Sequence, residues 1–317
     1  MPGAEWQYMV RLPLEEERGL DFCTDLFSPG YFQVPLSGGE SAMLSAQILT
    51  PAEPDELPFP AEPVPAPHAA GLDKAAAPGR DHMPLQDALE TAMRQFVVRR
   101  GAFKTVIAGY PWFLDWGRDT LICARGLIAG NMLDEVRAIL KQFARFEKDG
   151  TLPNMIRGDD AGNRDTSDAP FWFFVACADL TRALSSADWI EDDVGGRTVR
   201  DALNSIARGV MRGTPNNIKM DPESGLVFSP AHFTWMDTNH PAGTPREGYP
   251  IEIQALWHAA LSFLARVDTD PLWPAAAAQV RETLAARFWM PEKGYFADCL
   301  HAPPGTPAAR AVPDDAL

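Results

Sequence analysis

The chain has 317 residues, of which 46% are hydrophobic and 22% are charged, enough for one large domain or two smaller ones. Its net charge of −15 argues against binding to nucleic acids or anionic membranes, which both require basic surfaces. The four cysteines are far apart and form no CxxC pair, so we expect reduced thiols in a cytoplasmic protein and no metal site. The N-terminus shows no signal peptide, and the longest apolar stretch is too short to span a bilayer.

Three segments follow one another along the chain. Apolar residues alternate with others over 31–50, on both sides of a turn at SGGES, which predicts strands. Since two strands alone are not stable, residues 1–50 are predicted to be the end of a β-rich domain. Residues 51–83 are rich in proline and alanine and are predicted to be a linker. Residues 84–317 are predicted to be helical.

The predicted helices are of two kinds, which alternate. One kind has a single apolar stripe at spacings of three and four residues, and the other is apolar nearly all round, as in an enclosed helix. The striped segments are about 85–98, 136–143, 199–210 and 280–288, and the enclosed ones are 170–184, 251–265 and, less clearly, 119–130. Alternation of outer and inner helices predicts a mainly α fold of the α/α toroid type. A solenoid would also alternate, but it should show a fixed repeat length, which this sequence lacks.

A long polar segment precedes each of the three inner helices. We call these segments the first, second and third rim loops, at residues 110–119, 149–170 and 229–252. All three carry Asp and Arg, and Trp, His and Asn recur among them. Because the inner helices of a toroid run in the same direction, the rim loops should meet at one end of the barrel, where the helix N-termini add positive dipole ends.

Aromatic rings beside charged groups suit a sugar, which stacks its C–H faces on rings and offers hydroxyls to charged partners. The candidate rings are Trp112, Trp116, Trp172 and Trp235, and the candidate hydroxyl binders are Asp115, Arg118, Asp119, Asn154, Asp168, His232, Arg246 and Glu252. Structural roles remain open for each of them. A tryptophan can be a lid over the core, Asp119 and Asp168 can cap helices, and His232 can be a plain loop residue.

Five motifs, IAGYPWFLDWGRDT, LPNMI, DTSDAPFWF, HFTWMD and TPREGYPIEIQALW, resemble the glucosidase domain of glycogen-debranching enzymes, the amylo-α-1,6-glucosidase family. They occur in the family's order and cover about 94–300. The first 45 or so residues also resemble the end of the β-rich N-terminal domain of bacterial and archaeal members. The resemblance implies a twelve-helix (α/α)6 barrel that hydrolyses α-1,6-linked glucosyl residues of glycogen or a related branched α-glucan, with inversion and without a cofactor.

The resemblance also assigns roles to individual residues. It implies that Asp237 in TWMD is the general acid, and that Arg118 and Asp119 hold the terminal glucose, with Trp112 and Trp116 shaping the same subsite. By the same resemblance Trp235, Arg246 and Glu252 lie near the cleavage point. An acid must keep its proton, and the apolar neighbours of Asp237 in the sequence favour the protonated form. From the residues alone, an aspartate capping a turn explains Asp237 as well.

The sequence also departs from the family. We count seven helices where the family has twelve, and the general base belongs to a part expected beyond Leu317. The sequence therefore predicts a fragment that is inactive alone, and a second chain that completes the barrel is one interpretation. We expect apolar flanks of the inner helices 170–184 and 251–265 to be exposed in such an open arc. Alternatives are another α-glucoside hydrolase of glucoamylase or trehalase type, an inactive glucan-binding module, or a helical scaffold without a ligand.

Overall fold

The structure is a computed structural model that describes residues 5–13, 16, 22–28, 30, 33–40, 42, 84–110, 113–158, 160–237 and 245–313. It divides into two units, Met1–Pro84 and Leu85–Leu317, each described here by itself. The predicted linker 51–83, the predicted strand at 43–49 and the candidate ring Trp112 lie outside the described residues.

The first unit contains an antiparallel pair of strands, β1 (Glu5–Arg11) and β2 (Cys23–Ser28). Trp6 packs on Phe27 across the pair, with ring centroids 5.1 Å apart. The strands therefore lie earlier in the chain than the sequence predicted. Residues 33–40 contain the predicted turn but no strand, so the strand prediction is wrong there. Alternation of apolar residues is not enough to make a strand when no described segment pairs with it.

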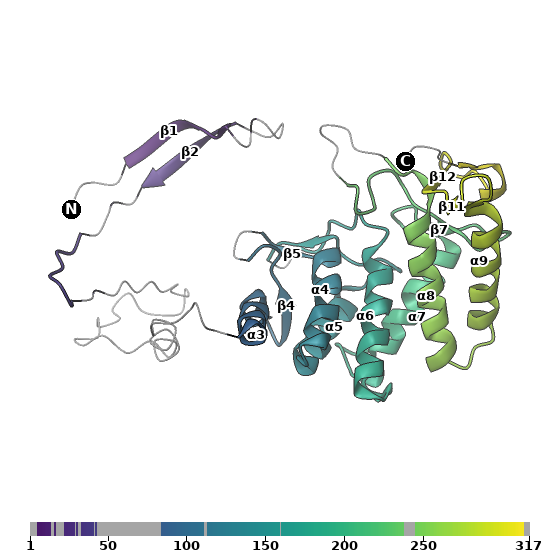
Figure 1. The fold of residues 1–317 in the computed structure, drawn as a ribbon, viewed down its shortest axis with the longest axis horizontal. Helices are drawn as coiled ribbons and strands as arrows, with labels where there is room; N and C mark the ends of the chain where they lie inside the picture. Colours follow the sequence, from purple (N-terminus) through teal and green to yellow (C-terminus); the bar gives the residue numbers. More distant parts are fainter. Residues whose placement is uncertain are drawn as a thin grey trace. The chain divides into compact units, whose positions relative to one another are not determined.

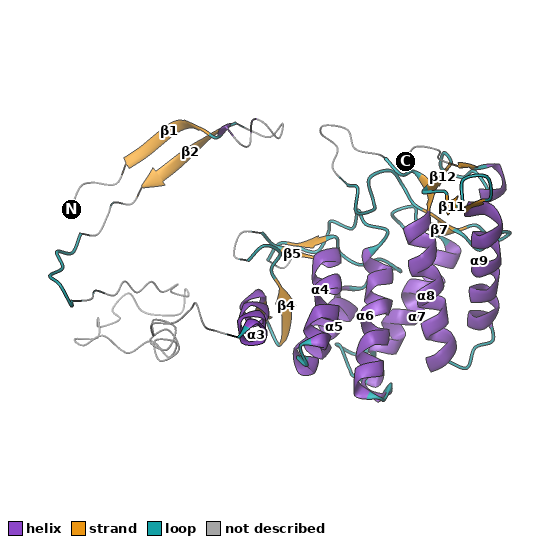
Figure 2. Ribbon diagram, viewed as in Figure 1, coloured by secondary structure: helices purple, strands orange, loops and turns teal. Residues whose placement is uncertain are grey.

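The second unit is mainly helical, as predicted (Figures 1 and 2). Its described residues form seven α-helices of twelve or more residues: α3 (Leu85–Phe96), α4 (Gly117–Ala129), α5 (Leu133–Phe146), α6 (Ala169–Leu184), α7 (Val199–Arg212), α8 (Ile251–Val267) and α9 (Leu272–Phe288). Each predicted helix is present, which confirms the fold class and the number of helices expected from the sequence.

The helices form two layers. In the inner layer α6 lies between α4 and α8 and contacts both, and the outer helices α5, α7 and α9 contact the inner layer (Figure 1). Large apolar side chains fill the space between the layers; Phe143, Phe171, Trp257 and Trp273 are all fully buried. The alternation of inner and outer helices predicted from the sequence is therefore confirmed from α4 to α9, whereas α3, predicted to have one buried face, has no buried residue.

The inner helices are not enclosed all round, which corrects the prediction from their composition. One stripe of α6 stays half-exposed or exposed, at Trp172, Val175, Asp179 and Arg182. Two of these four residues are charged, and Arg125 of α4 donates from Nε to Asp179 Oδ2 at 2.7 Å. The expectation of large apolar flanks on α6 and α8 is also wrong, because the exposed large hydrophobic residues of this unit lie elsewhere, apart from Leu184 at the end of α6.

Short strands lie between the helices along the chain. The antiparallel pairs are β3 (Val97–Arg100) with β4 (Phe103–Val106), β5 (Asp115–Trp116) with β6 (Met155–Ile156), β7 (Lys219–Met220) with β8 (Val227–Phe228), and β10 (Trp289–Met290) with β11 (Tyr295–Phe296). A three-stranded sheet has β12 (Cys299–His301) between β9 (Gly248–Pro250) and β13 (Val312–Pro313). Two 3₁₀ helices, Asp188–Glu191 and Ala308–Arg310, complete the regular structure.

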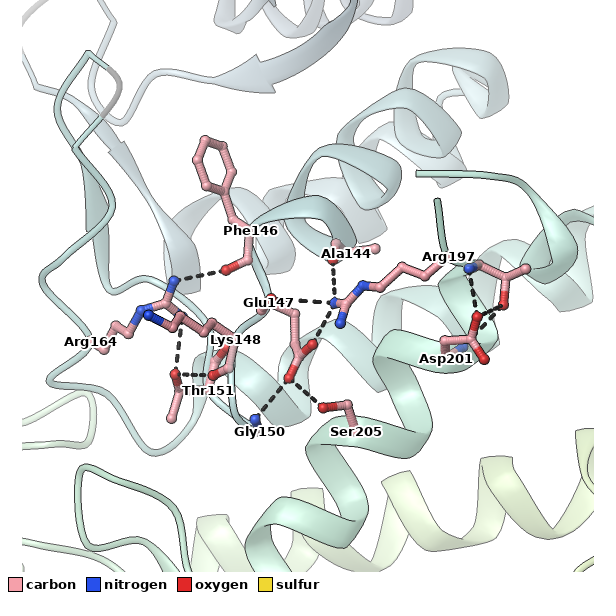
Figure 3. A network of polar contacts seen from close by, with 11 residues as sticks. Ala144, Phe146, Glu147, Lys148, Gly150, Thr151, Arg164, Arg197, Asp201 and Ser205 are labelled. Atoms are coloured by element: carbon pink, nitrogen blue, oxygen red, sulfur yellow. Dashed lines mark hydrogen bonds and ion pairs between the residues drawn. The ribbon is translucent and has the colours of Figure 1, made fainter. Parts of the chain in front are cut away.

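A buried carboxylate joins the end of α5 to α7 (Figure 3). The Glu147 side chain is fully buried, pairs with Arg197, and accepts hydrogen bonds from Gly150 N and Ser205 Oγ, each at 2.8 Å. Arg164 of the second rim loop donates to the backbone oxygens of Phe146 and Thr151 beside it. The network therefore fixes the start of the second rim loop against the outer helices.

Two glycines allow this junction to close. A Cβ atom on Gly209 of α7 would lie 2.7 Å from the Cα atom of Gly150, and Gly150 itself has a φ of +83°. We expect Gly209→Ala to lower the free energy of unfolding by about 1–3 kcal/mol, because the overpacked contact is with backbone. Gly126→Ala in α4 is the matched control, since nothing lies within 4 Å of its added Cβ. It should raise stability by about 0.4–1 kcal/mol. Urea unfolding of both variants checks the prediction, and equal effects would contradict it.

All four cysteines are free thiols, in agreement with the expected reduced state. Burial raises the pKa of the Cys177 thiol well above its ordinary value and that of Cys299 to about 12. Such thiols behave as apolar core groups rather than nucleophiles. Among the described residues, no helix combines the length and the apolar character that crossing a bilayer requires.

Candidate active site

The first and second rim loops are joined by hydrogen bonds and by close backbone contact. Strands β5 and β6 pair Asp115 with Ile156 and Trp116 with Met155. Gly117, the first residue of α4, donates from its N–H to Asn154 O at 2.8 Å. A Cβ atom on Gly117 would lie 2.5 Å from the backbone oxygen of Pro153, so only glycine fits here. The N-terminus of α4 is therefore fixed against the second rim loop.

The second and third rim loops are joined in the same way. Ser167 N donates to Phe233 O at 2.7 Å, and the hydroxyls of Ser167 and Ser229 are hydrogen-bonded at 2.7 Å. Within the third loop, Ser229 pairs with Gly248 through two backbone hydrogen bonds. The three rim loops thus meet at one end of the inner layer, as the sequence predicted.

Arg118 binds two carboxylates from the other two rim loops. Its Nε donates to Asp168 Oδ2 at 2.5 Å, and its Nη1 donates to Asp237 Oδ2 at 3.0 Å. Asp168 is the anchor of the pair: its side chain is only 3% exposed, and its second oxygen accepts from Thr166 Oγ1. The Asp237 side chain is 34% exposed, so it remains open to a ligand.

The charge of Arg118 is stabilised by these partners. Burial lowers the pKa of its guanidinium, but the hydrogen bonds and charges of Asp168 and Asp237 outweigh burial and hold that pKa above its ordinary value. The guanidinium is therefore a fixed positive charge between two carboxylates, with its third nitrogen, Nη2, buried and without a hydrogen-bond partner in the described part of the chain.

A hollow of about 580 Å³ opens beside this arginine. Its lining comes from all three rim loops and consists of Trp116, Arg118, Asp119, Asn154, Asn163, Asp165, Ala231, His232, Phe233 and Asp237. The volume is large enough for a sugar residue or a short oligosaccharide. The aromatic rings can stack on the C–H faces of a sugar, and the carboxylates, amides and guanidinium can bind its hydroxyls. Six of the predicted site residues therefore share one hollow.

The other candidates lie outside this lining. Asp115 is buried and receives two hydrogen bonds from Arg100, at 2.6 and 2.8 Å, so its role in the fold is structural. Trp172 is half-buried on the partly exposed stripe of α6, with Arg125 Cζ 5.9 Å from its ring centroid. Trp235 is 56% exposed. Asp168 acts on the hollow through Arg118 rather than by lining it.

Arg246 and Glu252 belong to a second charged cluster, with Asp298. The Arg246 side chain is almost fully buried and binds both carboxylates. Burial lowers the pKa of Arg246, but hydrogen bonds and charges from Glu252 and Asp298 outweigh it and hold that pKa above its ordinary value. Through Asp298, the cluster connects the third rim loop to the segment before β12. The Glu252 side chain is 25% exposed.

Besides Ala231, sequence reasoning missed four residues of the hollow and of the second charged cluster. Asn163, Asp165 and Phe233 lie in rim loops that the sequence singled out, so their polar or aromatic character in those loops was the available signal. For Asp298 the sequence offered no signal, because it is 52 residues from its partner Arg246. Within the described residues, no group of three or more His, Cys, Asp or Glu side chains is arranged to hold a metal ion.

Comparison with known proteins agrees with the motifs that line this hollow. The profile of the amylo-alpha-1,6-glucosidase family matches residues 91–308, which include all three rim loops. The chain belongs to the amylo-alpha-1,6-glucosidase family. A second profile, that of the glycogen debranching enzyme N terminal region, matches residues 1–43. The family membership implied by the five motifs is thus confirmed.

Two proteins similar to this family member have low sequence identity to it. A glycogen debranching enzyme from Saccharomyces cerevisiae is 24% identical over 233 residues, and the match covers 53% of this chain and 15% of the yeast protein. Among solved structures, a rhamnosidase from Klebsiella oxytoca with rhamnose bound is 14% identical, with a TM-score of 0.42, over 58% of this chain and 34% of the rhamnosidase. The chain therefore spans only a small part of the length of the yeast relative.

Proposed function

We propose that the hollow binds the terminal, α-1,6-linked glucosyl residue of a branched α-glucan, and that Asp237 is the general acid of an inverting site whose base is not among the described carboxylates. The observation that carries this proposal is the Arg118 guanidinium, which binds carboxylates from both other rim loops at the wall of one hollow. Membership of the amylo-alpha-1,6-glucosidase family supports the same substrate class.

In this proposal each residue has a distinct task. Asp168 orients Arg118, and Arg118 in turn orients Asp237 and offers its third nitrogen to a sugar hydroxyl. Trp116 provides a ring on which a C–H face of the sugar can stack. Asp237 acts in its protonated form: Oδ2 keeps the hydrogen bond from Arg118 Nη1, and the other oxygen, Oδ1, gives its proton to the glycosidic oxygen as the bond to C1 breaks. An inverting reaction also needs a base about 6.5–9.5 Å from the acid to activate water.

We assign no base among the described carboxylates, so we expect this chain alone to bind the glucan without hydrolysing it. The other buried or half-buried carboxylates discussed above are engaged: Asp115 by Arg100, Asp168 by Arg118, and Glu252 by Arg246. A second candidate function, complete hydrolysis by this chain, is favoured by Asp119 and Asp165, two further carboxylates that line the same hollow.

Panose and maltotriose distinguish these functions, because the terminal glucose of panose is α-1,6-linked and that of maltotriose is α-1,4-linked. Binding to the full chain is measured by calorimetry, and glucose release is followed by proton NMR, which also identifies the anomer. We expect tighter binding of panose and no release of glucose. Release of β-glucose from panose would instead support the second candidate, preference for maltotriose would support a glucoamylase type, and binding of neither sugar would overturn the proposal.

A further inference from the structure

Three residues that line the hollow each have a buried polar atom with no hydrogen-bond partner within the described part of the chain. These atoms are Arg118 Nη2, Asn154 Oδ1 and His232 Nδ1. A buried polar atom without a partner is costly, and most such groups in folded proteins are satisfied. Three such atoms, on lining residues from three separate rim loops, indicate a set of polar groups reserved for a ligand.

Asn154 is held rigidly in the second rim loop. Its residue is only 6% exposed, its N–H donates to Asn163 O at 2.9 Å, and its carbonyl oxygen accepts from Gly117 at 2.8 Å. Both backbone groups of Asn154 are therefore bonded to neighbouring segments. The side-chain amide is placed at the hollow by a backbone that does not need to move when a ligand arrives.

His232 is held on a strained backbone in the third rim loop. Its φ is +62°, a left-handed conformation that costs a non-glycine residue about 1–3 kcal/mol. The conformation is fixed from both sides, because His232 N donates to Pro245 O at 2.9 Å and the next residue, Phe233, accepts from Ser167 N at 2.7 Å. Strain kept in place by such bonds is typical of functional sites.

The chemistry of the three atoms points to hydroxyl groups. Arg118 Nη2 can only donate, Asn154 Oδ1 can only accept, and His232 Nδ1 donates or accepts according to its tautomer. A hydroxyl both donates and accepts, so it satisfies such a mixed set, whereas a phosphate or carboxylate only accepts. The carboxylates of Asp119 and Asp165 on the same lining further disfavour an anionic ligand.

We propose that Asn154 and His232, together with Arg118 Nη2, read the hydroxyl pattern of the terminal sugar and restrict the hollow to neutral sugars. This inference rests on the proposed function and adds to it the residues that set specificity. A site built to bond a hydroxyl rejects an analogue that lacks it, because the polar atoms are then left buried and unpaired.

The test compares variants of the full chain with panose, methyl α-glucoside and its monodeoxy derivatives as probes in calorimetry. His232→Gly removes the imidazole and relieves the strained φ, His232→Asn keeps a polar group at a residue type that tolerates positive φ, and Asn154→Ala removes the acceptor. Asn204→Ala is the control, since Asn204 also has an unpaired buried Oδ1 but lies on α7, outside the lining. Thermal melting of each variant checks that it is folded.

We expect His232→Gly and Asn154→Ala to weaken panose binding by about tenfold or more, His232→Asn to weaken it less, and Asn204→Ala to leave it unchanged. The parent chain should discriminate against one or two monodeoxy derivatives, and His232→Gly or Asn154→Ala should lose that discrimination. The inference is overturned if both variants bind panose and every derivative as the parent chain does. If the parent chain itself binds no sugar, the proposed function fails instead, and the inference with it.

Discussion

Replacing Arg118 with lysine is expected to weaken panose binding by about 10- to 100-fold. Lysine keeps the positive charge beside Asp168, but a single ammonium cannot reproduce the Nε, Nη1 and Nη2 positions that the guanidinium offers to Asp168, Asp237 and a ligand. Loss of one charged hydrogen bond to the sugar is worth about 1.5–3 kcal/mol, which gives this range of affinity. Calorimetry with panose measures the effect.

The matched control is Arg137→Lys on the outer helix α5. Arg137 also binds an aspartate through two nitrogens, Nε and Nη2 to Asp192 at 2.7 Å each, but it does not line the hollow. Its variant should bind panose as the parent chain does. Equal weakening in both variants, or none in Arg118→Lys, would mean that the bridging arginine does not bind the sugar.

Glu147→Ala is expected to cause the largest loss of stability, about 3–5 kcal/mol, because it removes one partner of a buried ion pair. The substitution leaves Gly150 N, Ser205 Oγ and part of Arg197 without their acceptor (Figure 3). Small domains are stable by only about 5–15 kcal/mol, so the loss would be a large fraction of the total. Glu147→Gln, which keeps an acceptor oxygen, should lose less. Equilibrium unfolding in urea gives the values.

Glu191→Ala is the control for this prediction. Glu191 also pairs with an arginine, Arg200, but its side chain is 54% exposed. Removing an exposed pair changes stability by about 1 kcal/mol at most. If Glu147→Ala costs no more than Glu191→Ala, the buried network does not hold α5 and α7 together.

The sequence was sufficient to predict the helices and their layers, because their apolar spacing reports burial directly. It overstated the burial of the inner helices, although a signal was present. In α6 the residues at 172, 175, 179 and 182 follow helical spacing, so Asp179 and Arg182 share a face with Trp172. These two charged residues on a largely apolar helix were therefore the available signal of partial exposure on that face.

The ion-pair partners of individual charged residues could not be predicted from the sequence. Asp115 looked like a sugar binder because it lies between two aromatic residues, but Arg100 at the end of β3 binds both its oxygens. Arg246 forms an ion pair with Asp298, which is 52 residues away in the chain. The three-stranded sheet of β9, β12 and β13 brings the two residues together. Local motifs predicted which loops carry chemistry, whereas the long-range hydrogen bonds decide which side chains remain available to a ligand.

The central claim is that the hollow beside Arg118 holds the terminal glucose of an α-1,6-linked branch, and a crystal structure of the full chain with panose tests it most directly. We predict the terminal glucose in the hollow, with Arg118 Nη2 and Asn154 Oδ1 bonded to its hydroxyls and Asp237 at the oxygen of the α-1,6 bond. Panose bound at another surface, with the lining of the hollow unoccupied, would contradict the account.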